Sequence, residues 1–259
     1  MIKIKNILIT GARSGIISDV IERVMYDYNI YLTVHTESEL KKVRTKYKNN
    51  SNIKCFKLDL LDEKDIGKID KIKIDILINN AAIMESGSII EMPFKKIRDN
   101  FEVNLFSTFK ITRKVIRKNP NAKIIIISSL AGRIPVPFCG AYSASKSALT
   151  KSFESLNMEL KLENKKTQIV IIEPGLYETG FNEYGFDKKY EFMDIDTFFK
   201  EQLEMIKKRE KIFLKILQKK TVNSISKKIE KAIIEENPKL YYRAPISQVL
   251  FVKIYNLFH

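Results

Sequence analysis

Tyr142 and Lys146 are spaced so that both can act on one proton transfer. They are four residues apart in the string YSASK, and residues at this spacing share one face of a helix. Ser129 stands thirteen residues before Tyr142, just after a run of isoleucines. Tyr184 and Lys188 have the same spacing without this context, and we interpret that second pair as chance.

A phenol beside an ammonium group can give or take a proton near neutral pH. A free tyrosine has a pKa of about 10, whereas general acid–base catalysis favours a pKa near the working pH. Lowering it by about three units corresponds to roughly 4 kcal/mol of preference for the phenolate. The ammonium group of Lys146 is a source of that preference, so we expect it to lower the pKa of Tyr142.

A glycine-containing turn, TGARSGII, spans Thr10 to Ile17 directly after the first apolar run. In such a turn, backbone N–H groups at a helix N-terminus approach a pyrophosphate. Two glycines also suit an ordinary strand-to-helix turn. Their place after the first strand favours a dinucleotide site built on Gly11 and Gly15.

Short runs rich in isoleucine and valine alternate with amphipathic segments along the chain. The predicted strands are residues 5–10, 31–35, 53–58, 74–79, 123–128, 168–173 and 239–243, and the predicted helices are residues 15–28, 38–47, 93–118, 141–163 and 222–236. Near-continuous apolar strands indicate a parallel sheet that is covered on both faces. We therefore predict the α/β class, with one Rossmann-type domain over residues 1–259. Its doubly wound parallel sheet has about seven strands and helices on both faces.

In order and spacing, these motifs resemble those of the classical short-chain dehydrogenases/reductases. The glycine turn, the string NNAA at 79–82, Ser129, the string YSASK and Pro174-Gly175 follow the family pattern between residues 5 and 179. The resemblance implies an oxidoreductase that moves a hydride between NADP(H) or NAD(H) and an alcohol or carbonyl substrate.

The resemblance also assigns roles to individual residues. Tyr142 would exchange the proton, Ser129 would hold the substrate oxygen, and Lys146 would bias Tyr142 and bind the nicotinamide ribose. Asn104 would position a water in a proton relay, although an asparagine inside a helix also bonds backbone groups. The predicted cofactor contacts are Gly11, Arg13, Ser14, Gly15, Ile16, His35, Thr36, Asp59, Leu60, Asn80, Ala81, Ala82, Tyr142, Lys146, Pro174, Gly175 and Thr179.

Two details bear on how the cofactor binds. Ile17 stands where the family has a third glycine, which lets the helix pack close to the strand. We expect Ile17 to displace the helix or to require smaller neighbours, so that Ile17→Gly would tighten cofactor binding. At the end of the second strand, His35 and Thr36 offer no carboxylate to a ribose 2′-hydroxyl, while Arg13 suits a 2′-phosphate. NADP(H) is therefore favoured over NAD(H), unless Glu37 reaches the ribose and reverses that choice.

Composition excludes several other classes. The chain of 259 residues has a formal net charge of +15, but its lysines are spread over predicted helix faces, so we expect a solvated surface and no nucleic-acid site. Neither the two cysteines nor the two histidines have metal-binding spacing, and no metal site is expected. The absence of a signal core and of any run of about eighteen apolar residues favours a cytoplasmic protein.

Residues 176–220 form a long connection dotted with phenylalanines. A connection of this length is typical of a lid over the substrate, and an ordinary helical insertion on the surface is the equal alternative. This layout resembles the retinol- and steroid-dehydrogenase-like branch and implies a lipophilic ketone or secondary alcohol. The apolar tail at 246–258 is expected to pack as a final helix or to contact a partner subunit, with a peripheral membrane contact less favoured. The family also pairs the helices that match residues 93–118 and 141–163, which implies a homodimer or homotetramer.

The chief alternative function is a cofactor-binding scaffold or sensor with little turnover. Ile17 favours that alternative, whereas the complete set of Ser129, Tyr142 and Lys146 disfavours it. A sugar-nucleotide epimerase or dehydratase uses the same Tyr–Lys pair, but it has a different glycine spacing and a longer C-terminal domain.

Overall fold

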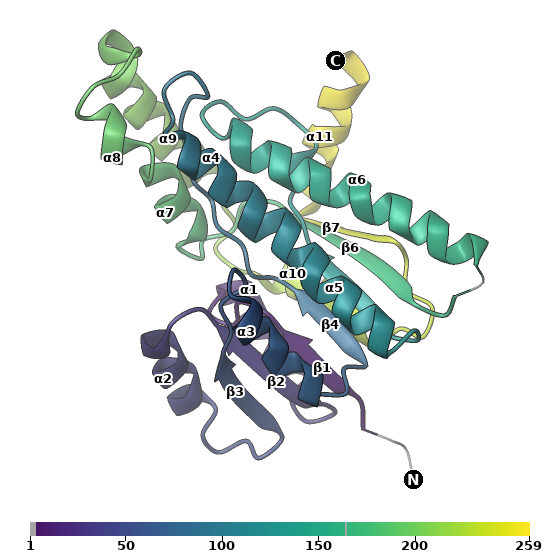
Figure 1. Ribbon diagram of the computed structural model, residues 1–259. Helices are drawn as coiled ribbons and strands as arrows, with labels where there is room; N and C mark the ends of the chain where they lie inside the picture. The colour runs from purple at the N-terminus through teal and green to yellow at the C-terminus, as the bar shows by residue number, and fades with distance from the viewer. Residues whose placement is uncertain (1–3, 164) are drawn as a thin grey trace.

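Seven parallel strands form one sheet through the centre of the molecule (Figure 1). The computed structural model describes residues 4–163 and 165–259. The spatial order is β3-β2-β1-β4-β5-β6-β7, so strand order reverses between β1 and β4, where open α/β sheets bind ligands. The bounds are β1 Asn6–Ile9, β2 Asn29–Val34, β3 Ile53–Lys57, β4 Ile76–Asn79, β5 Lys123–Ile127, β6 Gln168–Pro174 and β7 Tyr241–Ala244. This confirms the predicted fold class.

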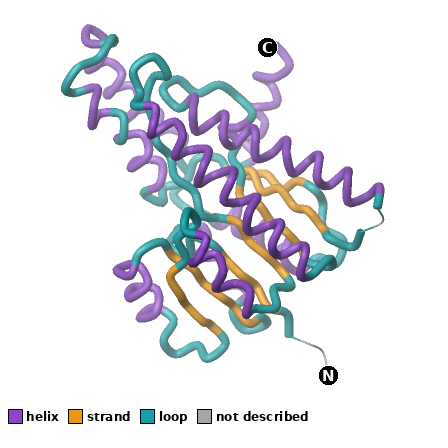
Figure 2. Tube along the Cα trace, in the orientation of Figure 1, coloured by secondary structure: helices purple, strands orange, loops and turns teal. Residues whose placement is uncertain are grey.

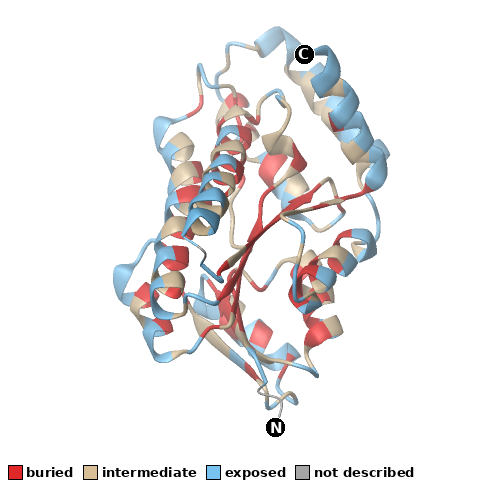
Figure 3. Cartoon of the chain, turned by 90° about the vertical axis from the view of Figure 1, so that its right-hand side faces the viewer, coloured by how far each residue is buried: buried red, intermediate tan, exposed pale blue. Residues whose placement is uncertain are grey.

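Helices cover both faces of the sheet because its strands are apolar on both sides. Ile7 and Ile9 face one core cluster, while Leu8 between them faces the other. The first cluster is covered by α1 (Gly15–Val24), α2 (Glu37–Lys46) and α10 (Asn223–Ile234); the second is covered by α3 (Glu63–Gly67), α5 (Ser107–Lys118) and α6 (Gly140–Leu162). Figure 3 shows the buried residues along the sheet and the exposed residues on the outer sides of the helices.

The predicted helix at 93–118 is one uninterrupted helical run that contains a π-helical turn. It consists of α4 (Phe94–Phe101), a π-helical turn at Glu102–Phe106 and α5, with Pro93 capping the start. Apolar periodicity indicates a helix but does not reveal one extra residue in a turn. Such π turns often lie at functional sites, and this one contains Asn104.

Residues 176–220 are largely helical, as one of the two interpretations of this segment had it (Figure 2). They form α7 (Phe181–Asp187), α8 (Tyr190–Met193), a 3₁₀ turn at Lys200–Gln202 and α9 (Leu203–Leu217). The two ends of this insertion lie side by side, because Tyr177 and Lys219 form a parallel β-bridge. The insertion is therefore closed at its neck.

The tail forms a further helix, α11 (Ile246–Phe258), in which Val252 is the one buried residue. The tail thus forms the expected final helix and contacts the chain through Val252 and Gln248, but most of it is not packed; contact with a partner subunit stays a prediction. Most of the apolar residues of α11 are exposed, because only one side of the helix contacts the rest of the chain. Among the described residues, no helix is long and apolar enough to cross a bilayer.

Candidate active site

The glycine turn is held at the carboxyl end of β1 by the segment that follows β4. The side-chain amide of Asn80 donates to the carbonyl oxygens of Thr10 (3.1 Å) and Gly11 (2.7 Å). The Thr10 hydroxyl accepts from the N–H groups of Asn80 (3.0 Å) and Ala81 (3.1 Å). Gly11 has a φ of +67°, and a Cβ there would lie 2.7 Å from the Ala81 Cα. Both the conformation and the close approach require glycine.

The N-terminus of α1 suits a pyrophosphate. The Ser14 side chain does not cap it, and its first turn has no acidic residue, so its leading N–H groups are available to an anion. Thr179, from the start of the insertion, lies against Gly15, where an added Cβ would approach its Cγ2 to 3.2 Å. The structure thus brings together the predicted contacts from the turn and from Thr179, and they fit a dinucleotide phosphate.

Ile17 is fully buried within the core cluster that α1 forms with the sheet. Its side chain is part of the packing, so removing it leaves a void. This changes the expectation for Ile17→Gly, which we now expect to lower stability.

The variant Ile17→Ala is expected to lower the free energy of unfolding by about 3 kcal/mol, because it removes a fully buried side chain. Ile195→Ala removes the same atoms from an exposed position and should change stability by less than about 0.5 kcal/mol. Urea unfolding of both variants measures the difference. Equal, small effects would mean that the protein relaxes around position 17.

At the carboxyl end of β2, a carboxylate is present that sequence reasoning did not single out. Glu39 accepts from the N–H groups of His35 (3.2 Å) and Thr36 (3.3 Å), and its other oxygen pairs with Arg13 (3.2 Å). Its place as the third residue of α2, after Thr36, is the signal of a capping box, and that box is present. Glu37, considered above for the ribose, lies in the first turn of the same helix.

The segment after β3 lies beside the carboxyl end of β2. The side chain of Asp59 accepts from the N–H of Leu61 (2.9 Å), and its carboxylate lies 3.7 Å from His35 Nδ1. Leu60 is buried beside it. The predicted contacts His35, Thr36, Asp59 and Leu60 therefore lie at neighbouring strand ends.

Helix α6 carries Tyr142 and Lys146 to the end of β5, where Ser129 follows the strand. The close approach depends on Gly132, at which a Cβ would lie 2.9 Å from the Lys146 carbonyl carbon. Ser128 ties β5 to α6 by donating to the Lys146 carbonyl oxygen (3.1 Å). The Ser129 hydroxyl lies near enough to Tyr142 to lower the pKa of its phenol. The three predicted catalytic side chains thus meet.

Burial has the largest effect on the pKa values of Tyr142 and Lys146. It raises the pKa of Tyr142, against the smaller, opposite effect of Ser129, and it lowers the pKa of Lys146 to about 7. Lys146 Nζ donates to the Ile127 carbonyl oxygen (2.9 Å) and lies 5.9 Å from the centre of the Tyr142 ring. Desolvation penalises the charged forms of both groups, so in this arrangement burial outweighs the expected effect of Lys146 on Tyr142. The raised pKa keeps the Tyr142 phenol protonated at neutral pH.

Asn104 is fixed by the loop after β4. Its side-chain amide donates to the Ile83 carbonyl oxygen (2.9 Å) and to Ser145 Oγ (3.0 Å), and its oxygen accepts from the Ile83 N–H (2.9 Å). Ser145 in turn donates to the Tyr142 carbonyl oxygen (2.7 Å). The Asn104 side chain therefore bonds backbone groups and also Ser145, a link to α6 that sequence reasoning missed. Its role in positioning a water stays a prediction.

Apolar side chains surround Tyr142. Met84, Cys139 and Phe186 form a buried cluster with it, and the Phe181 ring centre lies 6.3 Å from that of Tyr142. Phe181 and Phe186 belong to the insertion, which therefore covers the candidate acid. Others of its phenylalanines attach the insertion to the body, for example Phe199, whose ring centre is 5.2 Å from that of Phe138.

The turn after β6 is held by the C-terminal helix. Pro174 ends the strand, and a Cβ on Gly175 would lie 2.0 Å from Gln248 Oε1 of α11. The same oxygen accepts from the Leu176 N–H (2.8 Å), and Gln248 Nε2 donates to the Leu217 carbonyl oxygen (2.8 Å). Gln248 therefore binds both ends of the insertion.

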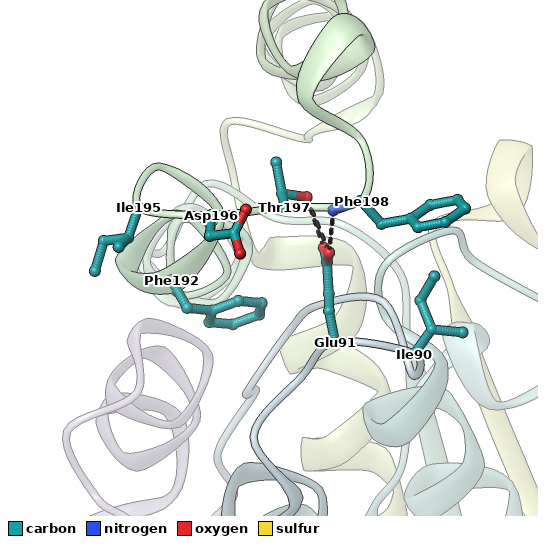
Figure 4. A pocket seen from close by; sticks show the side chains of 7 residues that line it. All are labelled: Ile90, Glu91, Phe192, Ile195, Asp196, Thr197 and Phe198. Carbon is teal, nitrogen blue, oxygen red and sulfur yellow. Dashed lines mark hydrogen bonds between the residues drawn. The ribbon is translucent and has the colours of Figure 1, made fainter.

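A separate surface cleft of about 910 Å³ lies where the far end of the insertion meets residues 88–92 (Figure 4). Glu91 accepts from the Thr197 hydroxyl (3.0 Å) and from the Phe198 N–H (2.9 Å). Ile195 and Phe198 on its rim are exposed. None of the predicted catalytic or cofactor residues lines it.

The fold and the meeting of an acid with a dinucleotide cradle define a protein of the oxidoreductase class. The sequence matches the short chain dehydrogenase family over residues 5–189, and the chain belongs to that family. It is 26% identical over 264 residues to the NADPH-dependent 3-dehydrocapnine reductase of Ornithobacterium rhinotracheale, covering 94% of this chain and 89% of the relative. It is 35% identical over 185 residues to the 3-oxoacyl-acyl-carrier-protein reductase FabG of Buchnera aphidicola, covering 67% and 74%. A short chain dehydrogenase/reductase from Burkholderia phymatum in complex with NAD has a TM-score of 0.80 at 19% identity, covering 98% of this chain and 94% of that one.

Proposed function

We propose that the protein is an NAD(P)-dependent oxidoreductase that interconverts a lipophilic ketone and its secondary alcohol. The observation that carries the proposal is the meeting of Ser129, Tyr142 and Lys146 beside the glycine turn, at the carboxyl ends of β1, β4 and β5. Burial raises the pKa of Tyr142, so near neutral pH its phenol holds the proton that carbonyl reduction consumes.

Each residue of the candidate site has a separate role in the proposed reaction. The reduced nicotinamide, when bound, supplies a hydride to the carbonyl carbon. Ser129 donates a hydrogen bond that holds the substrate oxygen, and the Tyr142 O–H bond breaks as its proton forms the new O–H bond of the alcohol. Lys146 has one donor bound to the Ile127 carbonyl oxygen, and its other donors would hold the nicotinamide ribose. The oxidation of the alcohol reverses each step.

The apolar surroundings of Tyr142 support the substrate class. Met84, Phe181 and Phe186 would contact the parts of a substrate that flank its carbonyl group, and the insertion acts as a lid that excludes water from the reacting atoms. The two sequence relatives named above are reductases by name, which agrees with the reductive direction. The relation to the retinol- and steroid-dehydrogenase-like branch, the cytoplasmic location and the homo-oligomer remain predictions.

We infer that NADP(H) is the preferred cofactor. Arg13 is about two-thirds exposed and pairs with Glu39, whose carboxylate is also bound to two backbone N–H groups. Glu39 is therefore held away from a ribose hydroxyl, while the free donors of Arg13 can bind a 2′-phosphate. The O. rhinotracheale relative is NADPH-dependent by name.

A fluorescence titration with NADPH and NADH tests both proposals. We expect saturable binding of both, with NADPH at least about tenfold tighter, because hydrogen bonds to charged groups contribute about 1.5–3 kcal/mol. Arg13→Ala should remove that difference and leave NADH binding unchanged, whereas Glu39→Gln should keep or increase it. Arg98→Ala, which alters an arginine stacked on Phe94, is the control. Failure to bind either dinucleotide at millimolar concentration contradicts the oxidoreductase proposal; equal binding contradicts the inferred preference.

A further inference from the structure

The outer face of α11 is apolar where a surface helix is normally polar. Its exposed residues include Ile246, Leu250, Ile254 and Leu257, which recur at intervals of four, four and three, with Phe251 and Phe258 beside them. At 3.6 residues per turn these six side chains form one continuous stripe. The opposite face holds Val252 and Gln248, which contact the rest of the chain.

Helix α9 shows an exposed apolar stripe bordered by lysines. Met205, Ile212 and Ile216 lie on one face, and none of the residues of α9 is buried. The adjacent face carries lysines at 208, 211 and 215, which are all exposed. Between residues 207 and 220 the chain has seven basic residues and one acidic residue. That acidic residue, Glu210, is engaged by the buried Lys189 (2.6 Å).

These two helices adjoin each other. Gln248, in the first turn of α11, donates to the carbonyl oxygen of Leu217, the last residue of α9. Both helices lie at the top of the view in Figure 1, at the end of the molecule away from the N-terminus. No acidic residue occurs within α11. The apolar stripe of α11 and the basic, partly apolar helix α9 therefore meet at the ends that Gln248 and Leu217 join.

We propose that α9 and α11 together bind the surface of an anionic lipid bilayer, with the stripe of α11 inserted among the lipids and the lysines of α9 on the headgroups. Apolar stripes flanked by lysines are the pattern of helices that lie in the membrane interface, and each basic residue near an anionic surface adds attraction. A second copy of the chain fits this surface less well, because a two-fold contact would place the two basic segments against each other. The proposal does not depend on the enzymatic function.

Vesicle co-sedimentation of the full chain without added cofactor tests the proposal. Vesicles of phosphatidylcholine with about a third phosphatidylglycerol should bind the protein, and pure phosphatidylcholine vesicles should bind it at least about tenfold less. Binding to the anionic vesicles should weaken as sodium chloride is raised, because salt screens the lysines.

Two pairs of substitutions test the apolar stripe of α11 and the lysines of α9 independently. Leu250→Glu with Phe251→Glu should lower the partition coefficient at least about tenfold, and Lys211→Glu with Lys215→Glu should do so at low salt only. The control is Met158→Glu with Leu162→Glu, a pair of exposed apolar residues on α6, which should leave binding unchanged. All these positions are exposed, and circular dichroism checks that each variant is folded.

Two outcomes would overturn the proposal. One is a wild-type protein that stays in the supernatant with anionic vesicles. The other is a wild-type dimer in solution that Leu250→Glu with Phe251→Glu converts into a monomer, which would assign the stripe to a second copy of the chain.

Discussion

Replacing Tyr142 with phenylalanine is expected to lower kcat/KM for carbonyl reduction by at least about a thousandfold. General acid–base groups typically contribute between about 10² and 10⁴ in rate, and Tyr142 is the phenol of the buried cluster with Met84, Cys139 and Phe186. The ring of phenylalanine keeps the packing against Met84 and Phe186, so NADPH affinity should change by less than about threefold. Steady-state kinetics and a cofactor titration on the same preparation measure both quantities.

Tyr184→Phe provides the matched control, because Tyr184 has a lysine four residues later but lies on α7 with its ring under Lys188 (4.7 Å). We expect it to keep wild-type activity. Retention of more than a few per cent of activity by Tyr142→Phe would show that another group donates the proton.

The variant Lys146→Met is expected to lose activity by about a hundredfold or more and to bind NADPH more weakly, since it removes the predicted contact with the nicotinamide ribose. It should also change how stability depends on pH. Burial lowers the pKa of Lys146 to about 7, whereas an unfolded lysine has a pKa of about 10.4. Between these values the unfolded chain binds a proton that the folded chain has released, so this group makes the folded state gain stability as pH rises.

Methionine has no such proton, so the stability of Lys146→Met relative to the wild type should fall by roughly 2–3 kcal/mol from pH 7 to pH 9. Urea unfolding at several pH values measures it. Lys161→Met, an exposed lysine on the same helix, should show no such trend. A parallel pH dependence of Lys146→Met and wild type would mean that Lys146 remains charged when buried.

Local patterns were sufficient to predict the sheet and the catalytic helix. Apolar runs specify strands that are buried on both faces, and the predicted helix at 141–163 matches α6 to within one residue at each end. The spacing of Tyr142 and Lys146 then required only that this helix form. Gly11 was predictable because its turn demands both a positive φ and a close backbone approach.

Features that depend on contacts between distant segments were not predictable in this way. The pKa of Tyr142 depends on residues of the insertion, which cover it from some forty positions further along the chain. Glu39 is an ordinary capping residue in sequence, and only the fold places Arg13 against it. For α11, apolarity predicted a helix packed on the chain or on a partner subunit, and a sheet that is already covered offers it little surface within the chain.

The closed neck of the insertion bears on how such an enzyme can evolve. Tyr177 and Lys219 are paired, and Gln248 holds the backbone on both sides of them, so the intervening segment leaves the body and returns at a single place. Chain segments with adjoining ends tolerate insertion, deletion and exchange, because they are joined to the rest of the structure only at those two ends. Substrate choice can therefore diverge through recombination of one contiguous stretch of the gene, while the residues that handle the proton are inherited unchanged.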